Sequence, residues 1–521
     1  LVQSILCLTS EIKEPLPKDT LKRLDLPTKK EAFFHIHNPE NSKTLAKAKR
    51  RIVFEEFLLL QLSLLLRREL HKKCNSPQLS IELSSNSLVR KFLSILPFSL
   101  TDAQKRVLKE IESDIVKAEP MSRLLQGDVG SGKTVIAISA LLTAVQSGWQ
   151  AAFMAPTEVL ASQHYQTLSK WIPQLELNVD LLTGSTPKAR RKQILTDLVN
   201  GSTKILIGTH ALFQKDVSFN NLGFIVIDEQ HRFGVHQRLA LKQKGNTRTP
   251  HQLVMTATPI PRTLTMSMYA DMDASIIDEL PPGRTPITTS VLPDNRRQDV
   301  VERIRTLCGN GAQAYWVCTL IEESEALESQ AAEAASKELT AALPELSVSL
   351  IHGRMSHDKK TSVMDRFKRG AIDLLIATTV IEVGVDVPNA TLMIIENSER
   401  LGLAQLHQLR GRVGRGLNES HCLLLFHQPL GELCKQRLSV MRDSSDGFFI
   451  AEEDLKIRGP GELLGSKQSG SLQFKIADLL RDNHLLDAVK KSSHELFKTD
   501  TAKIDLLIRR WTSIPDELSQ V

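Results

Sequence analysis

The sequence feature that most constrains the fold is the stretch 127–134, which reads GDVGSGKT. It follows an apolar pair at 124–125 and leads into the apolar run 135–138, so it has the strand–loop–helix context that the pattern G-x-x-x-x-G-K-[ST] requires. Glycines allow a tight turn whose backbone amides point at one anion, next to the positive end of a helix. We therefore predict a nucleotide-phosphate loop made of Gly127, Asp128, Val129, Gly130, Ser131, Gly132, Lys133 and Thr134.

Two side chains of this loop have specific roles in the prediction. Lys133 would reach the β- and γ-phosphates of a bound nucleotide, and the hydroxyl of Thr134 would bind Mg²⁺. The alternative is a glycine-rich turn that matches by accident, which the length and the context of the match disfavour.

Short apolar runs alternate with helical stretches twice along the chain, over residues 86–285 and again over 286–440. Continuous apolar strands separated by helices are typical of parallel sheets covered on both faces. We therefore predict an α/β chain with two tandem parallel-sheet lobes, a helical N-terminal segment (1–85) and a mixed, mostly helical C-terminal domain (441–521). Within that last domain, 446–449 and 458–462 are expected to be turns. Only the first lobe has a phosphate loop, so the second lobe should close over the nucleotide.

Composition sets the broad class of protein. The chain of 521 residues is too long for one core, and its net charge of +6 permits a nucleic-acid partner without requiring one. None of the six cysteines forms a C-x-x-C pair, which favours reduced thiols and a cytoplasmic location. The most apolar stretch, 57–66, is far shorter than the ~20 residues of a membrane span, so we expect no membrane partner. Because the chain begins with Leu1 rather than Met, we also expect a missing preceding segment.

Two carboxylates follow the apolar run 224–227, where parallel sheets present ligand-binding groups. Asp228 would bind Mg²⁺, and Glu229 would orient and deprotonate the attacking water. An isolated acidic pair after a strand is more often a helix cap or a solvated turn. Because this pair follows a phosphate loop, we favour a catalytic role.

Two arginines in the second series, Arg412 and Arg415, are spaced to face one side if that segment is helical. In a two-lobed arrangement they would stabilise the charge that develops on the γ-phosphate, as arginine fingers do. Without the motifs of the first lobe, a solvated basic patch or a nucleic-acid-binding turn would be the better interpretation.

Further motifs appear in a fixed order. Residues 156–157 (PT), 256–259 (TATP) and 408–415 (QxxGRxGR), together with the loop and the DEQH box at 228–231, resemble the motifs of superfamily-2 helicases and translocases. The resemblance extends over nearly all of 98–426 and implies RecA-like lobes that hydrolyse ATP. It also implies that Gln230 and His231 belong to the catalytic box.

The same resemblance assigns nucleotide contacts outside the loop. The segment 98–104 resembles the adenine-reading segment of the superfamily, in which Gln104 would hydrogen-bond the adenine edge and favour ATP over GTP. Phe98 belongs to the same segment. We also hypothesise that Gly384 and Asp386 sense the nucleotide from the second lobe.

A more specific resemblance lies outside the motor core. Residues 447–462 and 465–470 resemble the translocation segment that the RecG and Mfd families share, and the RGPGE sequence at 458–462 is closer to the RecG family. Residues 36–39 and 50–56 resemble the segment that joins the wedge domain of that family to its motor. We expect that wedge to precede Leu1 and to be absent here. The stretch from Arg458 to Gln468 would act as a lever between the lobes and DNA.

Membership of the RecG family implies an ATP-dependent translocase on double-stranded DNA that regresses stalled replication forks and moves Holliday junctions in recombination and repair. It further implies a monomer and a single-strand-binding protein as partner. The alternatives are an Mfd-like transcription-repair coupling translocase, or a wedge-less fragment with DNA-stimulated ATPase activity but no junction unwinding. A DNA-binding protein with a vestigial ATP site and a small-molecule kinase are more distant alternatives, because the site residues look intact and a kinase needs no second lobe.

A motor that tracks along a duplex should grip phosphates rather than bases. Small polar residues directly after apolar runs suit that role, although each one taken singly is more often a helix cap. The candidates are Pro156, Thr157, Thr183, Gly184, Thr209, His210, Thr256, Thr258, His352, Gly353, Thr378 and Thr379.

Overall fold

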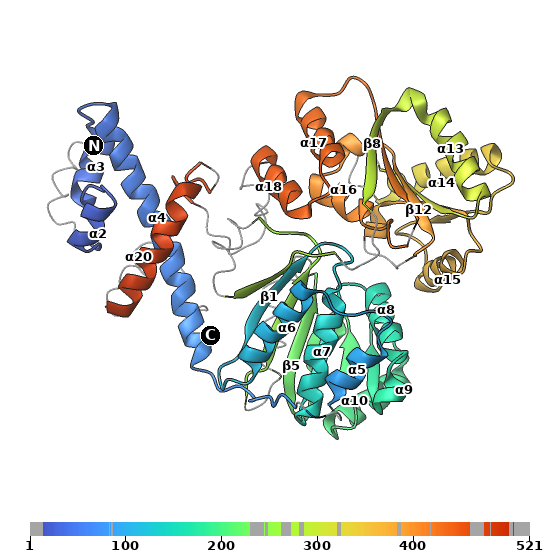
Figure 1. Cartoon of the computed structure of the whole chain (residues 1–521), viewed down its shortest axis with the longest axis horizontal. Coiled ribbons are helices and arrows are strands. Elements are labelled where there is room, and N and C mark those ends of the chain that lie inside the picture. The colour runs from blue at the N-terminus through green and yellow to red at the C-terminus, as the bar shows by residue number, and fades with distance from the viewer. Residues whose placement is uncertain are drawn as a thin grey trace. The chain divides into compact units, whose positions relative to one another are not determined.

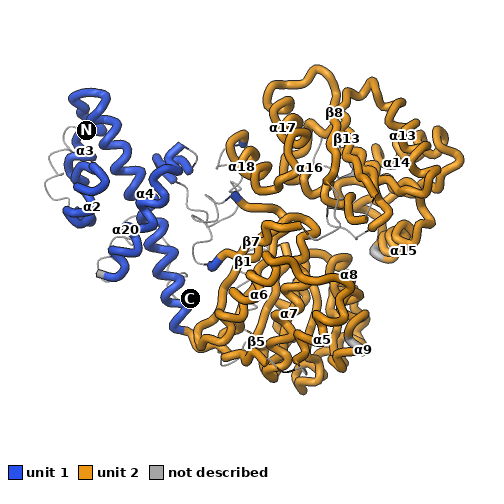
Figure 2. Tube along the Cα trace, viewed as in Figure 1, with its two compact units in different colours: residues 1–73, 261–273, 458–521 blue, residues 74–260, 274–457 orange. Residues whose placement is uncertain are grey.

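The computed structural model describes residues 14–82, 84, 87–229, 244, 248–261, 272–280, 286–319, 325–382, 387–416, 418–458, 474–479, 481–499 and 504. Figure 2 shows two compact units: one is formed by residues 1–73, 261–273 and 458–521, and the other by 74–260 and 274–457. Five predicted site residues lie outside the described residues: Gln230, His231, Gly384, Asp386 and Gln468. Within the described ranges, no helix has the length and apolarity that a membrane crossing requires.

The larger unit contains two sheets. The first has seven strands in the order β3-β4-β2-β5-β6-β1-β7, and the register is parallel from β3 across to β1. Strands β2, β4 and β5 are buried along their whole length, which is why they read as largely apolar runs. Their bounds are β1 Ser122–Gly127, β2 Gln150–Met154, β3 Val179–Leu182, β4 Ile205–Gly208, β5 Leu222–Asp228, β6 His251–Thr256 and β7 Asp273–Ile277.

Helices cover this sheet and make the first lobe (Figure 1). The most buried is α7, whose residues Ile136, Leu141 and Leu142 are fully enclosed in the core that also holds Phe153 and Phe224 of the strands. The bounds are α5 Leu88–Ile95, α6 Asp102–Ile115, α7 Lys133–Gln146, α8 Glu158–Ser169, α9 Ile172–Leu175, α10 Lys188–Val199 and the 3-10 turn η2 His210–Phe213.

The second sheet has six strands in the order β10-β11-β9-β12-β13-β8, all parallel. Its strands are β8 Ile287–Pro293, β9 Gln313–Val317, β10 Val348–Ile351, β11 Leu374–Ala377, β12 Ala390–Ile395 and β13 Ser420–Phe426. The helices of this second lobe are α13 Arg297–Gly309, α14 Glu325–Ala342, α15 His357–Lys368, α16 Leu403–Arg410, α17 Glu432–Asp443 and α18 Gly447–Arg458, with short turns η5 Asp294–Arg296, η6 Thr379–Glu382 and η7 Ser398–Arg400. The predicted pair of parallel-sheet lobes is therefore confirmed.

One local prediction is wrong. The sequence indicated turns at 446–449, but α18 begins at Gly447 and continues to Arg458. Asp446 explains the difference, because its carboxylate accepts a hydrogen bond from the amide of Phe448 at 2.9 Å and its carbonyl accepts one from Ile450 at 3.0 Å. The Asp446–Gly447 pair is thus the cap of a helix rather than the centre of a turn.

The smaller unit is built around the long helix α4, Ser42–Lys72, together with α2 Lys18–Arg23, α3 Lys29–His37, η8 Asn483–Leu485 and α20 Leu486–Thr499. Arg51 of α4 is almost fully buried and forms ion pairs with Glu55 at 2.6 Å and with Glu14 at 2.8 Å. Lys29 completes this network through Glu55. A buried guanidinium needs such partners on several sides, so the network fixes α3 against α4.

Candidate nucleotide site between the two lobes

The glycine loop connects β1 to α7, as the sequence predicts. Gly130 and Gly132 have φ angles of +79° and +85°, a region that favours glycine, and α7 begins at Lys133. The ammonium of Lys133 donates hydrogen bonds to the carbonyls of Gly127 at 2.7 Å and Asp128 at 2.9 Å. Its side chain is therefore folded over the loop, where an incoming phosphate would compete with these carbonyls for it.

Gln104, on α6, contacts the phosphate loop. Its side-chain amide donates to the carbonyl of Ser131 at 2.8 Å, and its carbonyl oxygen accepts from the amide of Thr101 at 3.0 Å. The second bond is half of a capping box at the start of α6. In this structure Gln104 is buried and holds the phosphate loop, whereas Phe98 is exposed. Contact of either residue with adenine remains a prediction.

The acidic pair lies where the sequence analysis expected it, at the carboxyl end of β5. Asp228 is the last residue of the strand, and Glu229 follows with a φ of +51°, an uncommon backbone conformation for a residue other than glycine. Burial raises the pKa of Glu229 from its ordinary 4.5 to about 7, the charge of Asp228 adds to this effect, and the charges of Lys133 and Arg412 oppose it. A carboxylate with a pKa near 7 suits a general base.

The backbone that carries the two arginines differs from the predicted one. The helical spacing that the sequence analysis assumed is wrong, because α16 ends at Arg410 and both Arg412 and Arg415 lie on the turn after it. That turn is closed by a hydrogen bond from Nε of Arg415 to the carbonyl of Gly411 at 3.2 Å.

Both lobes nevertheless contribute to one cavity of about 130 Å³. The first lobe supplies the phosphate loop, the acidic pair and residues of α8 and β6, and the second lobe supplies the two arginines and Gln408. The cavity is lined by Val129, Gly130, Lys133, Thr134, Leu160, Gln163, Asp228, Glu229, Met255, Ala257, Gln408, Arg412 and Arg415. The groups predicted to bind phosphate, activate water and stabilise charge thus meet in one place.

Most of the threonines among the predicted DNA contacts fall into two groups. Several are used inside the protein: Thr157 caps α8 by accepting from Leu160, Thr183 bonds its neighbours Ser185 and Thr186, and Thr256 bonds Thr258. By contrast, Oγ1 of Thr209 and Oγ1 of Thr378 are buried and have no hydrogen-bond partner among the described residues. These two threonines follow β4 and β11, which hold equivalent positions in the two sheets.

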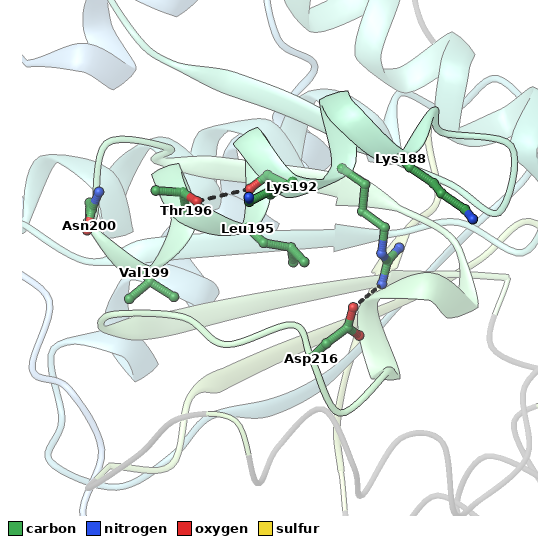
Figure 3. A pocket seen from close by; sticks show the side chains of 8 residues that line it. Lys188, Lys192, Leu195, Thr196, Val199, Asn200 and Asp216 are labelled. Carbon is green, nitrogen blue, oxygen red and sulfur yellow. Dashed lines mark hydrogen bonds and ion pairs between the residues drawn. The ribbon is translucent and has the colours of Figure 1, made fainter.

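A larger depression of about 520 Å³ lies on the outer surface of the first lobe and contains none of the predicted site residues (Figure 3). It runs along α10, where Lys188, Arg191 and Lys192 are gathered, and Arg191 is paired with Asp216 at 2.7 Å. Leu195 and Val199 add apolar surface, so the lining is mixed in character.

The sequences of the two lobes match models of known helicase families. Residues 101–267 match the family model of DEAD/DEAH box helicases, and residues 296–416 match that of the helicase conserved C-terminal domain. A more distant solved structure shares the fold. Saccharomyces cerevisiae Dbp5, solved with RNA and ADP BeF3, is 16% identical in sequence and matches with a TM-score of 0.52. The match covers 79% of this chain and 98% of that one. The fold and the site define an ATP-dependent helicase of superfamily 2 with two RecA-like lobes.

Outside the two lobes, the chain matches a more specific family model. Residues 444–508 match the model "ATP-dependent DNA helicase RecG, domain 3, C-terminal". The RecG helicase of Escherichia coli K12 is 52% identical over 513 residues, covering 96% of this chain and 73% of the relative, and that of Haemophilus influenzae is 51% identical over 492 residues, covering 92% and 71%. The chain belongs to the RecG family of ATP-dependent DNA helicases.

A solved structure of this family supports the assignment. In the solved structure of RecG bound to a three-way DNA junction, the protein is 42% identical in sequence to this chain. The two structures match with a TM-score of 0.72 over 91% of this chain. This chain corresponds to 62% of the length of that protein.

Proposed function

We propose that this chain is an ATP-driven translocase on double-stranded DNA that acts on branched substrates, regressing stalled replication forks and moving Holliday junctions during recombination and repair. The observation that carries the proposal is the cavity to which the phosphate loop of one lobe and Arg412 and Arg415 of the other both contribute. ATP in such a cavity contacts both lobes, so its binding draws them together and its hydrolysis releases them. The three-way junction bound by the related RecG supports branched DNA as the substrate.

Each site residue has a distinct task in this proposal. Lys133 exchanges its loop carbonyls for the β- and γ-phosphates. Glu229 in its ionised form takes a proton from the attacking water, while Arg412 and Arg415 stabilise the charge on the transferred phosphoryl group.

Mg²⁺ fits the same cavity. The hydroxyl of Thr134 and the carboxylate of Asp228 are oxygen donors, and a cation that keeps most of its own water needs few protein ligands. One carboxylate oxygen of Asp228 is already oriented by a hydrogen bond to His164. Bound there, Mg²⁺ would neutralise phosphate charge.

Phosphate gripping by the two lobes is supported by Thr209 and Thr378. A buried hydroxyl without a partner costs free energy, and an acceptor such as a phosphate oxygen would remove that cost when the backbone shifts to expose it. The equivalent positions of these threonines in the two sheets give the motor one grip on each lobe. A change in lobe separation during the ATP cycle would then move one grip relative to the other.

ATPase rates without DNA, with linear duplex and with a forked duplex test the proposal. A translocase of this kind shows DNA-stimulated turnover that is lost in Lys133→Ala. Lys188→Ala, which removes an exposed lysine from α10 of the same lobe, is the matched control and should behave as the wild type. Turnover that is indifferent to DNA would contradict the proposal.

Strand separation on a fork and on a Holliday junction separates full junction processing from DNA-stimulated hydrolysis alone. Monomeric action, a cytoplasmic location and association with a single-strand-binding protein belong to the same proposal. Cys308, Cys318, Cys422 and Cys434 are free thiols, in keeping with a reducing compartment.

A further inference from the structure

His407 joins the second lobe to the phosphate loop. It lies on α16, is buried, and places Nε2 2.7 Å from Oδ1 of Asp128 in the loop. Neither residue belongs to the acid–base or arginine groups of the cavity, yet their hydrogen bond links the two halves of the site directly.

Arg410 determines which nitrogen of His407 carries the proton. Its Nη2 lies 2.9 Å from Nδ1 of His407, and a guanidinium can only donate, so Nδ1 must accept. In the neutral ring the proton is then on Nε2, which donates to the carboxylate of Asp128. Arg410 is itself fixed by the carbonyls of Met441 at 2.9 Å and Ser444 at 2.8 Å.

Close packing surrounds this bond on both sides. A Cβ added at Gly411 would lie 2.8 Å from Cβ of Val129, so the turn that carries the arginines touches the phosphate loop. A Cβ added at Gly447 would lie 2.7 Å from Nε2 of His407 and 2.8 Å from Cγ of Pro259. The first residue of α18 therefore rests against the imidazole and against the segment after β6.

We propose that His407 is a positioning residue. Held by Arg410, it donates to Asp128 and thereby sets Arg412 and Arg415 against the phosphate loop. The inference rests on the proposed function, because it concerns the arginines that would act on the γ-phosphate. Through His407, the position of the second lobe affects the phosphate loop. The carbonyls that bind Arg410 and the start of α18 both contribute to this coupling.

Three variants test the role of His407. His407→Ala removes the donor, His407→Gln offers an amide N–H near the position of Nε2, and His427→Ala is the control because His427 forms an ion pair with Asp294 on the surface of the same lobe. We expect His407→Ala to lower the DNA-stimulated kcat about tenfold or more, the loss typical of a hydrogen bond to a charged group. Affinity for a fluorescent ATP analogue should fall by less than kcat does, because Lys133 and the other first-lobe groups of the cavity are unaltered. His407→Gln should recover most of the rate.

A second readout does not depend on turnover. Amide hydrogen exchange at 127–132 in the nucleotide-free protein should be faster in His407→Ala than in the wild type, and near the wild-type rate in His407→Gln. Equal kcat and equal exchange in His407→Ala and the wild type would overturn the inference, as would a His407→Gln protein no better than the alanine variant. If the wild type shows no stimulation by DNA, the proposed function fails, and the exchange experiment still decides the role of His407.

Discussion

Oδ2 of Asp228 lies 3.0 Å from Nε2 of His164, which is buried on α8. Because a carboxylate only accepts, Nε2 of the neutral ring carries the proton in this pair. The ring of His164 also packs on Phe153, with ring centroids 4.4 Å apart, so its direction is fixed from two sides. The helix that Thr157 caps therefore also holds the carboxylate expected to bind Mg²⁺.

Removal of this support should weaken the metal site. We expect His164→Ala to raise the Mg²⁺ concentration for half-maximal ATPase activity about tenfold, the effect typical of losing a group that orients a metal ligand. His164→Gln, whose amide can still donate, should be closer to the wild type. Tyr165→Phe on the same helix is the control, and a Mg²⁺ titration curve unchanged in His164→Ala would contradict the prediction.

The raised pKa of Glu229 should be visible in the pH dependence of hydrolysis. Only the ionised carboxylate can take a proton from water, so kcat/KM for ATP should rise as the pH passes through about 7 and level off above it. We expect Glu229→Gln to lose most of the activity at every pH. A wild-type profile that stays flat from pH 6 to pH 8 would exclude Glu229 as the base.

The same shift makes Glu229 a source of instability in the folded protein. Its folded pKa of about 7 exceeds the ordinary 4.5, so between these values the folded state binds more protons than the unfolded state and stability falls as the pH rises. Glu229→Gln should therefore be more stable than the wild type at pH 8, by on the order of 2 kcal/mol, with the difference shrinking toward pH 5. Thermal unfolding at both pH values measures this, and a variant less stable than the wild type at pH 8 would contradict it.

Local sequence patterns were sufficient for much of the fold and for the positions of the main site residues. The phosphate loop, the carboxylates after β5 and the arginines after α16 are each identified within a short window, because their chemistry depends on neighbours in the chain. The strands β2, β5, β9 and β12 are buried along their whole length and mainly apolar, so they stand out as apolar runs in the sequence. In contrast, β7 and β8 are only partly buried and carry polar residues, so they lack that signal.

The residues missed by the sequence analysis act through partners far away in the chain. His164 is 64 residues from Asp228, and His407 is 279 residues from Asp128. A histidine within a helix gives no local sign of such a partner, and only the closure of two sheets and two lobes brings each pair together.

Gln104 offers a direct test of the difference between its predicted and its observed role. Gln104→Glu keeps an acceptor for the amide of Thr101, so the cap of α6 survives, but it loses the donor to the carbonyl of Ser131. We expect affinity for ATP and for GTP to fall together, about threefold or more, because the shared phosphate loop is loosened. A loss confined to ATP would show instead that the amide reads the base.

Residues 474–477 follow the predicted translocation segment and are bound to the long helix α4. The carboxylate of Glu56 on α4 accepts hydrogen bonds from three successive backbone amides, those of Lys475 at 2.5 Å, Ile476 at 3.1 Å and Ala477 at 2.8 Å. Beside it, Phe57 meets the ring of Phe474 edge to face, with centroids 5.3 Å apart. Residues 474–477 are thereby anchored on the long helix. The lever that the sequence predicts up to Gln468 would need such a fixed point to transmit force.

Glu56→Ala removes the charged acceptor without touching the nucleotide cavity. We expect basal ATPase activity to stay within about twofold of the wild type, while displacement of a third strand from triplex DNA, a measure of translocation, falls about tenfold, because three amides lose an ionised partner. Glu69→Ala is the matched control, since Glu69 lies on the same helix and pairs only across the surface with Lys72 in the described contacts. Triplex displacement at the wild-type rate in Glu56→Ala would show that movement along DNA does not depend on this anchor, and a parallel fall in basal ATPase activity would assign Glu56 a structural role instead.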